Sequence, residues 1–406
     1  MTSTSELLPA AYRDLLDRCL KCGLCREVCP AFRALGNERF SPRGRLALLE
    51  ATLAGEDFGA PFREALDYCL ACRACAERCP SGVAADVLVL AARSAGLCRG
   101  GLPFFKSWAF RFALPRPRRM VALTRAINLT RRFGVLPAVL RALGLPGRMG
   151  MPKLERAPFA SADAPMEFPA SPGVGNRGRV SYFVGCAANY FYPTTARAVV
   201  ALLTRAGHDV VVPTARRCCG VPALANGDWA LARQLATANV AALAGDEPIA
   251  VDCGSCGLAL TFYYDDVLRI PGAAALRSRV RDFTQLVSLE TVAPAAGRIA
   301  YHDACHLARG LGVKQEPRRL LARRGEVVEI ETAGAVTCCG GAGVYGLTHA
   351  AIARAVGDER AAAIVATGAA EVAAGCSACV FYLNEALARQ SATARARHTA
   401  EVLAGP

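Results

Sequence analysis

Eight cysteines near the N-terminus fall into two copies of one motif, and no other feature constrains the fold of this chain as strongly. Each copy has the spacing C-x2-C-x2-C-x3-C-P. The first copy contains Cys19, Cys22, Cys25 and Cys29, and the second contains Cys69, Cys72, Cys75 and Cys79. Two-residue spacers let three thiolates of one short loop reach three corners of an iron–sulfur cube. Zinc also uses C-x2-C pairs, but it normally takes them from separated knuckles. The motifs therefore predict two [4Fe-4S] clusters.

The fourth cysteine of each motif is expected to serve the cluster of the other motif, because it begins a helix that points toward that cluster. The expected ligand sets are Cys19, Cys22, Cys25 and Cys79 for cluster 1, and Cys69, Cys72, Cys75 and Cys29 for cluster 2. This crossing would put the two clusters within electron-transfer distance of each other. Between the motifs, Ser41 and Pro42 form a helix start ahead of an apolar stripe. We therefore predict an α-helical, ferredoxin-like dicluster domain over residues 1–97.

The second half of the chain contains five cysteines twice, in the same order. The first copy has Cys186, Cys218, Cys219, Cys253 and Cys256, and the second has Cys305, Cys338, Cys339, Cys376 and Cys379. Matching cysteines are 119 to 123 residues apart, which indicates a duplication. In each copy, strands are expected to run into the first cysteine, to precede the Cys-Cys-Gly loop, and to run into the last C-x2-C pair. The expected strands cover 180–186, 208–212, 248–253, 298–305, 326–330 and 370–376.

Alternating strands and helices predict a duplicated α/β CCG domain with parallel sheets, over residues 179–295 and 296–406. The carboxyl ends of the strands would gather the cysteines in the crevice where such sheets bind ligands. Five soft thiolates at one strand end suit a metal cluster, a zinc ion or a thiol–disulfide centre, and a purely structural Cys-Cys-Gly loop is the alternative. Cys98 is left over and is interpreted as an ordinary thiol.

Most of the net charge of +14 comes from one segment. Residues 87–154 contain thirteen Lys and Arg residues, no Asp or Glu, and several aromatic residues. We interpret residues 98–178 as a basic connector, and residues 87–154 as able to contact an acidic partner or an anionic membrane surface. A solvated basic face on a helical linker is the alternative, and nucleic acid is disfavoured by the cysteine pattern. No stretch is apolar enough for a membrane span, and no signal peptide is evident, so we expect a cytoplasmic protein without disulfides.

Two glycine patterns and two histidines are weaker signals. The G-x-G-x-x-G pattern at 173–178 precedes a strand instead of following one, and the pattern at 341–346 continues a Cys-Cys-Gly turn. The first position does not suit a dinucleotide loop. At the second we expect the glycines to let the backbone wrap a cluster, with nucleotide binding as the alternative. His302 and His306 flank Cys305, where they could bind a metal, donate protons, or simply lie at a polar strand end. No catalytic set of Ser, His and Asp, no acid–base carboxylate pair and no P-loop accompanies them.

A dicluster module followed by two CCG repeats resembles the iron–sulfur subunits of glycolate oxidase (glycolate dehydrogenase). More distantly, it resembles those of anaerobic glycerol-3-phosphate dehydrogenase, the lactate-utilisation proteins and heterodisulfide reductase. The resemblance extends over nearly the whole chain. Its most discriminating strings are Ser-Pro-Arg-Gly-Arg at 41–45 and Tyr-Gly-Leu-Thr-His at 345–349.

The resemblance implies an electron-transfer subunit of a complex. FAD-containing subunits would oxidise glycolate to glyoxylate, or D-lactate to pyruvate, and the clusters of this chain would pass the electrons to a quinone or another membrane acceptor. It also implies that each CCG repeat can hold a non-cubane [4Fe-4S] cluster. A catalytic thiol or disulfide reductase is the alternative. The substrate stays open among glycolate, D-lactate and glycerol-3-phosphate, because its pocket would belong to a partner.

Overall fold

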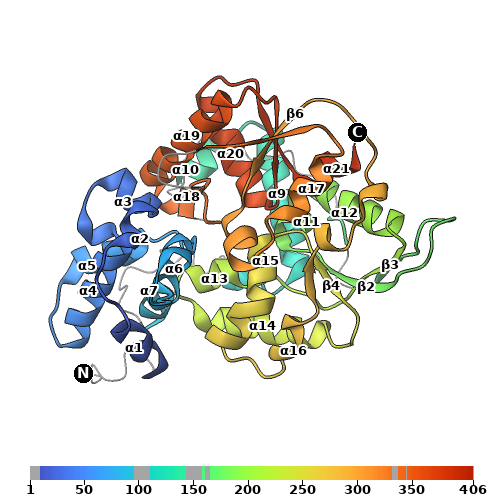
Figure 1. Cartoon of the computed structure of the whole chain (residues 1–406). Coiled ribbons are helices and arrows are strands. Elements are labelled where there is room, and N and C mark those ends of the chain that lie inside the picture. The colour runs from blue at the N-terminus through green and yellow to red at the C-terminus, as the bar shows by residue number, and fades with distance from the viewer. Residues whose placement is uncertain are drawn as a thin grey trace.

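The computed structural model describes residues 10–95, 110–142, 158–160, 165–331, 337–343 and 345–405. Residues 10–95 form a module of short helices, which is the left lobe in Figure 1. The helices are α1 (Ala10–Asp17), α2 (Leu24–Glu27), α3 (Pro30–Leu35), η2 (Glu38–Phe40), α4 (Pro42–Leu53), α5 (Gly59–Asp67), α6 (Ala74–Arg78) and α7 (Ala85–Ser94). The start of α4 is confirmed, because the Ser41 side chain accepts a hydrogen bond from the backbone N–H of Gly44. Leu49, Leu66 and Leu88 are completely buried in the core of the module.

Repeat 1 is built on a five-stranded sheet in the order β1-β3-β2-β4-β5. Its strands are β1 (Met166–Phe168), β2 (Gly178–Phe183), β3 (His208–Val212), β4 (Ile249–Val251) and β5 (Val280–Asp282). All pairs are parallel except β1 with β3. The connecting helices are α11 (Cys186–Tyr190), α12 (Pro193–Arg205), α13 (Val221–Ala225), α14 (Trp229–Ala242), α15 (Gly254–Leu258), π-helical η3 (Ala259–Val267) and α16 (Ala274–Arg277), followed by the short turns η4 (Phe283–Gln285) and η5 (Leu289–Thr291).

Repeat 2 has a four-stranded, fully parallel sheet in the order β7-β6-β8-β9. Its strands are β6 (Arg298–His302), β7 (Glu326–Glu329), β8 (Glu371–Ala374) and β9 (Arg395–His398). Its helices are π-helical η6 (His306–Gly310), α17 (Gln315–Leu321), α18 (Tyr345–Thr348), α19 (Ala350–Ala366), α20 (Ser377–Arg389) and α21 (Thr399–Ala404). The predicted parallel α/β repeats are therefore present.

The sequence missed three strands, β1, β5 and β9. Each is only three or four residues long, and β9 (Arg-Ala-Arg-His) carries charge at alternate positions, so none has the apolar run that marks a buried strand. Strand β1 lies inside the segment that we expected to serve only as a connector. That segment also forms α9 (Pro117–Arg132) and α10 (Leu136–Ala142), and α9 begins at a proline.

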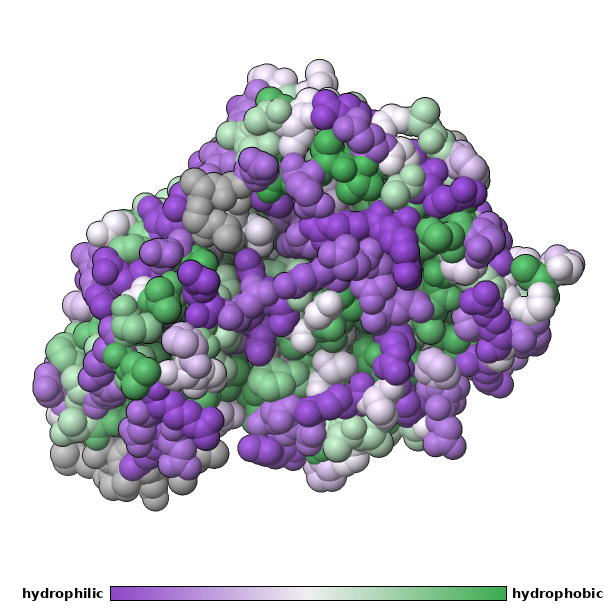
Figure 2. Space-filling view, in the orientation of Figure 1, coloured by the Kyte–Doolittle hydropathy of each residue, from purple (hydrophilic) through white to green (hydrophobic). Residues whose placement is uncertain are grey.

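The three parts pack against one another. Helix α12 of repeat 1 lies against α21 of repeat 2, and the two sheets share one apolar cluster. The helical module contacts both repeats through α7 with α13 and α3 with α19. Figure 2 shows hydrophilic side chains over most of one face, with a notch between the left lobe and the repeats. Among the described residues, every helix is too short or too polar to cross a bilayer.

Candidate metal centres

The two C-x2-C-x2-C loops of the helical module share one backbone conformation. Lys21 and Gly23 of the first loop have positive φ angles of 54° and 86°, and Ala71 and Arg73 of the second have 50° and 63°. Left-handed residues on either side of the middle cysteine let a short loop turn its thiols inward. Arg73 takes this conformation without being glycine, and its guanidinium lies 3.3 Å from the buried carboxylate of Asp86.

The structure brings Cys29 to the second loop. Cys29, Cys69, Cys72 and Cys75 line one small cavity, which is the set expected for cluster 2. Cys29 is the residue before α3, so the helix start turns its thiol away from its own loop. The completely buried side chain of Arg45 closes the same cavity. Its Nε donates to the carbonyl of Ala65 at 2.5 Å, and its Nη1 lies 3.9 Å from the Cys29 sulfur.

Cys19, Cys22, Cys25 and Cys79 line a second small cavity, which is the set expected for cluster 1. Cys75 lines this cavity as well, so the two cavities share a wall. After Cys79 the chain makes a turn before α7, whereas the sequence suggested a helix start there. The donor chemistry fits two cubanes, because each cavity gathers at least four thiols from two separate loops.

The cysteines of the repeats lie where strands end. Cys186 begins α11 after β2, Cys253 precedes α15 after β4, and Cys376 precedes α20 after β8. The Cys186 and Cys218 sulfurs are 3.6 Å apart. The Cys-Cys-Gly loop of repeat 2 needs its glycine, because Gly340 has a φ of 80° and a Cβ there would lie 2.3 Å from the carbonyl oxygen of Ala353.

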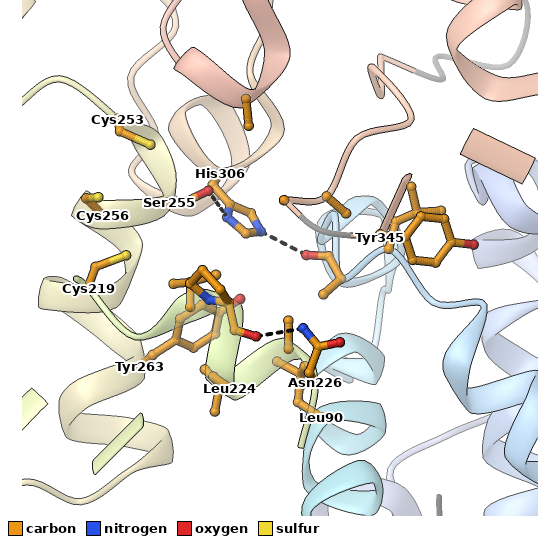
Figure 3. A pocket seen from close by; sticks show the side chains of 18 of the residues that line it. Leu90, Cys219, Leu224, Asn226, Cys253, Ser255, Cys256, Tyr263, His306 and Tyr345 are labelled. Carbon is orange, nitrogen blue, oxygen red and sulfur yellow. Dashed lines mark hydrogen bonds between the residues drawn. The ribbon is translucent and has the colours of Figure 1, made fainter. Parts of the chain in front are cut away.

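Both repeats open onto one cavity of about 950 Å³. Nine of the ten repeat cysteines line it, together with Cys69 of the helical module; the tenth, Cys218, contacts Cys186. In its lining the sulfurs of Cys253 and Cys376, which occupy equivalent positions in the two repeats, are 3.8 Å apart. Figure 3 shows the repeat 1 side of this cavity, with Cys219, Cys253 and Cys256 on one wall.

His306 links three of the sites. Its Nε2 donates to the carbonyl of Ala71 in the second cysteine loop, and its Nδ1 then accepts from the hydroxyl of Ser255, both at 2.9 Å (Figure 3). Ser255 lies between Cys253 and Cys256, and His306 itself follows Cys305. Burial lowers the pKa of His306, so the ring is neutral at pH 7 and acts as a bridge between loops.

Hydrogen bonds between thiols dominate the electrostatics of the repeats. The hydrogen bonds from Cys218 and Cys256 lower the pKa of Cys219 to about 6, and Cys338 and Cys379 hold the pKa of Cys339 well below its usual value. Burial raises the pKa of Asp252, next to Cys253, to about 8. Each repeat therefore offers a thiolate in its Cys-Cys pair, and thiolates bind soft metals and attack disulfides.

The second glycine pattern is explained by packing. A Cβ at Gly341 or Gly346 would overlap the ring of Tyr382, whose hydroxyl donates to the carbonyl of Gly343 at 2.8 Å. These glycines make room for an aromatic ring.

Several functional residues gave no signal in the sequence. Arg93 looked like an ordinary member of the basic segment, yet it is buried and donates to the backbone of the second cysteine loop. Arg45 belongs to the Ser-Pro-Arg-Gly-Arg string, but the sequence did not show that its side chain is buried beside the Cys29 sulfur. Arg111, which was counted with the basic segment, forms a bidentate ion pair with Asp228 of repeat 1. Cys98 lies outside the described residues.

The comparisons agree with this architecture. Residues 15–83 match the 4Fe-4S dicluster domain, and residues 180–261 and 299–384 match the cysteine-rich domain. The fold and the cysteine sets thus define an iron–sulfur protein with one dicluster module and a duplicated cysteine-rich domain. The chain is 30% identical to the "Probable glycolate oxidase iron-sulfur subunit" of Bacillus subtilis (strain 168), over 99% of this chain and 98% of that protein. It belongs to the family of glycolate oxidase iron–sulfur subunits.

Two further relatives match about half of the chain. "Lactate utilization protein A 1" of Bacillus anthracis (strain CDC 684 / NRRL 3495) is 27% identical over 56% of this chain and 98% of that protein. A subunit of the fumarate reductase (CoM/CoB) of Methanothermobacter marburgensis is 31% identical over 55% of this chain and 45% of that protein. The similarity therefore extends to proteins named for several different substrates.

Proposed function

We propose that this chain is the electron-transfer subunit of a complex in which FAD-containing partner subunits oxidise glycolate to glyoxylate, with D-lactate as a further substrate. The full-length similarity to a glycolate oxidase iron–sulfur subunit supports glycolate, and the relative named for lactate utilisation supports the broader class of 2-hydroxy acids. The partners carry the substrate site in this proposal.

The observation that carries the proposal is the convergence of the N-terminal cysteines on two adjoining cavities. We assign cluster 1 to Cys19, Cys22, Cys25 and Cys79, and cluster 2 to Cys69, Cys72, Cys75 and Cys29. Bound cubanes would relay single electrons. The chain supplies the thiolates, the apolar surroundings and the buried Arg45 that offsets their charge. We further propose that residues 1–97 are the ferredoxin-like domain, 98–178 the connector, and 179–295 and 296–406 the repeats, with β1 added to repeat 1.

The arrangement of the sites suggests a direction for the electrons. Cys72 packs in the same apolar cluster as Cys305 and Cys338 of repeat 2, and Cys69 lines the large cavity. Electrons that enter the helical module would therefore leave it toward the repeats, whose cysteines we propose hold further clusters.

The basic hairpin, which we define as α9, α10 and the turn between them, contacts α11 of repeat 1 through α9. Pro117 and Met120 of α9 line a small cavity together with Cys186 and Cys218. Its outer side exposes large apolar residues, including Phe133 at 69% exposure, among arginines. We propose that this hairpin rests on the inner face of the cytoplasmic membrane and brings repeat 1 close to a quinone or another membrane acceptor.

Iron analysis of anaerobically purified protein tests the assignment. We expect about eight irons for the two cubanes alone and up to about sixteen if both repeats are filled. Cys29→Ser should remove about half of the cubane iron, and Cys98→Ser is the matched control that should remove none. Zinc-loaded protein without iron would refute the proposal.

A thiol or disulfide reductase is the second candidate, because a cavity of about 950 Å³ lined by cysteines is large enough for a small substrate. In that case replacing Cys219 or Cys339 by serine should abolish turnover while the paramagnetic signals of the cubanes persist. Unchanged turnover would exclude this candidate.

A further inference from the structure

The two repeats differ at one equivalent strand position. Phe183 ends β2 and pairs with Val251, which lies two residues before Cys253. His302 ends β6 and pairs with Ala374, which lies two residues before Cys376. The two side chains therefore occupy the same place relative to their cysteines. Repeat 1 has an apolar ring there, and repeat 2 has an imidazole.

A second difference supports the first. The glycine of each Cys-Cys-Gly loop packs against the second helix after it, Gly220 against Ala232 of α14 and Gly340 against Ala353 of α19. Seven residues after each of these alanines, repeat 1 has Asn239 and repeat 2 has Arg360. Both of these side chains are buried.

The two residues of repeat 2 act together. Arg360 Nε lies 3.2 Å from Nδ1 of His302. A guanidinium can only donate, so Nδ1 must accept and the ring proton must be on Nε2. Nε2 is buried and has no nitrogen or oxygen partner among the described residues. The ring nitrogen, the Cys339 sulfur and the Cys379 sulfur lie within 4.8 Å of one another. Because Nδ1 faces Arg360, Nε2 is the ring nitrogen left for the hydrogen bond by which His302 helps to lower the pKa of Cys339.

Repeat 1 has no comparable donor at this position. Phe183 belongs to the same buried apolar cluster as Cys218, Cys219 and Cys256, and its ring offers no N–H group. Asn239 instead supports the loop backbone, donating from Nδ2 to the carbonyl of Cys218 at 3.0 Å and accepting from the N–H of Arg217 at 2.6 Å. The duplicated sites therefore share their cysteines, but at these two positions they differ in charge and in hydrogen bonding to sulfur.

We propose that His302 is a positioning residue that donates its Nε2 proton in a hydrogen bond to Cys339 and, with the buried Arg360, makes the site of repeat 2 easier to reduce than the site of repeat 1. Hydrogen bonds to sulfur and nearby positive charge both stabilise an added electron. The step concerned is the transfer of one electron from the helical module to repeat 2, in which no bond forms or breaks. The inference rests on the proposed function, because it requires redox centres in the repeats.

An anaerobic redox titration of the full-length protein, followed by electron paramagnetic resonance, tests the inference. The double variant His302→Phe with Arg360→Asn copies the native pair of repeat 1, so it leaves no unpaired buried charge. We expect this variant to lower the equilibrium constant for reduction of the higher-potential repeat centre at least tenfold. For a one-electron couple, this lowers the reduction potential by about 59 mV. His302→Gln keeps an N–H donor at about the same reach and should recover most of the shift.

The reciprocal double variant, Phe183→His with Asn239→Arg, should make the lower-potential centre easier to reduce and narrow the gap between the two. It gives a second measurement with repeat 2 intact, in case the first variant does not fold. Unchanged potentials in both variants, or a shift of the lower-potential centre in the first, would overturn the inference. Iron equal to the two cubanes alone would also overturn it and would leave the proposed function standing, whereas loss of cubane iron from the native protein would refute that function.

Discussion

Arg93 holds the second cysteine loop and the first repeat together. Its Nη2 lies 2.6, 3.0 and 2.7 Å from the carbonyl oxygens of Leu66, Asp67 and Cys69, and its Nη1 donates to the carbonyl of Ala225 at 2.8 Å. The first two carbonyls belong to the last turn of α5, where no intrahelical donors remain and the helix dipole is negative. A single buried cation thus caps a helix, fixes the start of the cluster 2 loop and ties it to α13.

Arg93→Met keeps most of the apolar stem and removes every donor. Each hydrogen bond to a charged group is worth about 1.5–3 kcal/mol, but three of the four share one nitrogen. Counting them as about two independent bonds gives an expected loss of about 3–5 kcal/mol in the free energy of unfolding, in the range found when one partner of a buried charged pair is removed. Arg93→Lys keeps the charge without the planar fork and should lose less.

Urea unfolding under anaerobic conditions measures the loss, followed by the visible absorbance of the clusters and by far-ultraviolet circular dichroism. Arg125→Met is the matched control, because Arg125 is exposed on α9, and it should change the unfolding free energy by less than about 0.5 kcal/mol. A loss below about 1 kcal/mol for Arg93→Met, with normal iron content, would refute this role of the guanidinium.

Three further outcomes are expected. Gly340→Ala should lower the free energy of unfolding, measured by denaturant titration, by about 2–4 kcal/mol, because a left-handed φ is combined with a clash against the carbonyl oxygen of Ala353. Gly343→Ala is the matched control, because it has a similar φ but open space around it, and it should lose about 1–2 kcal/mol. Equal losses in the two variants would contradict the clash. Burial raises the pKa of Asp282 from 3.8 to about 7, so the folded state binds a proton on this carboxyl more tightly than the unfolded state does. The bound proton stabilises the folded state by up to about 4 kcal/mol, and this stabilisation is lost as pH rises from about 4 to about 7. Asp282→Asn should reduce the dependence of the melting temperature on pH in that window. An unchanged dependence would contradict this role of Asp282. Phe133→Ser should weaken flotation with anionic vesicles at low salt, and native protein that never floats would show that the basic hairpin serves a protein partner.

The grouping of the N-terminal cysteines around two cavities and the strands with apolar runs could be predicted because spacing and periodicity are local. The turn that brings Cys29 to the second loop follows from the motif itself. The strands β2, β4 and β8 contain runs of apolar residues that predict their burial. The short edge strands β1, β5 and β9 lack such runs. They form because each pairs with a neighbouring strand of the sheet, and the sequence of the edge strand does not record that pairing.

The contacts between parts could not be predicted for a different reason. His306 forms a hydrogen bond with the carbonyl of Ala71, which is 235 residues away in the sequence. No local sequence pattern indicates such a long-range contact. Arg45 and Arg93 are buried cations whose partners are mostly backbone carbonyls, which every residue has. A sequence therefore indicates which thiols gather, and only the packed chain shows what surrounds them.

The face-to-face placement of the duplicated halves has an evolutionary consequence. Two identical subunits meeting about a twofold axis would carry every mutation on both sides of the cavity at once. Joining the halves in one polypeptide removes that constraint: Cys253 and Cys376 still lie close together as symmetry mates would, while Phe183 and His302 have been free to diverge. A duplicated gene can thereby encode two different sites where a symmetric dimer would have two equal ones.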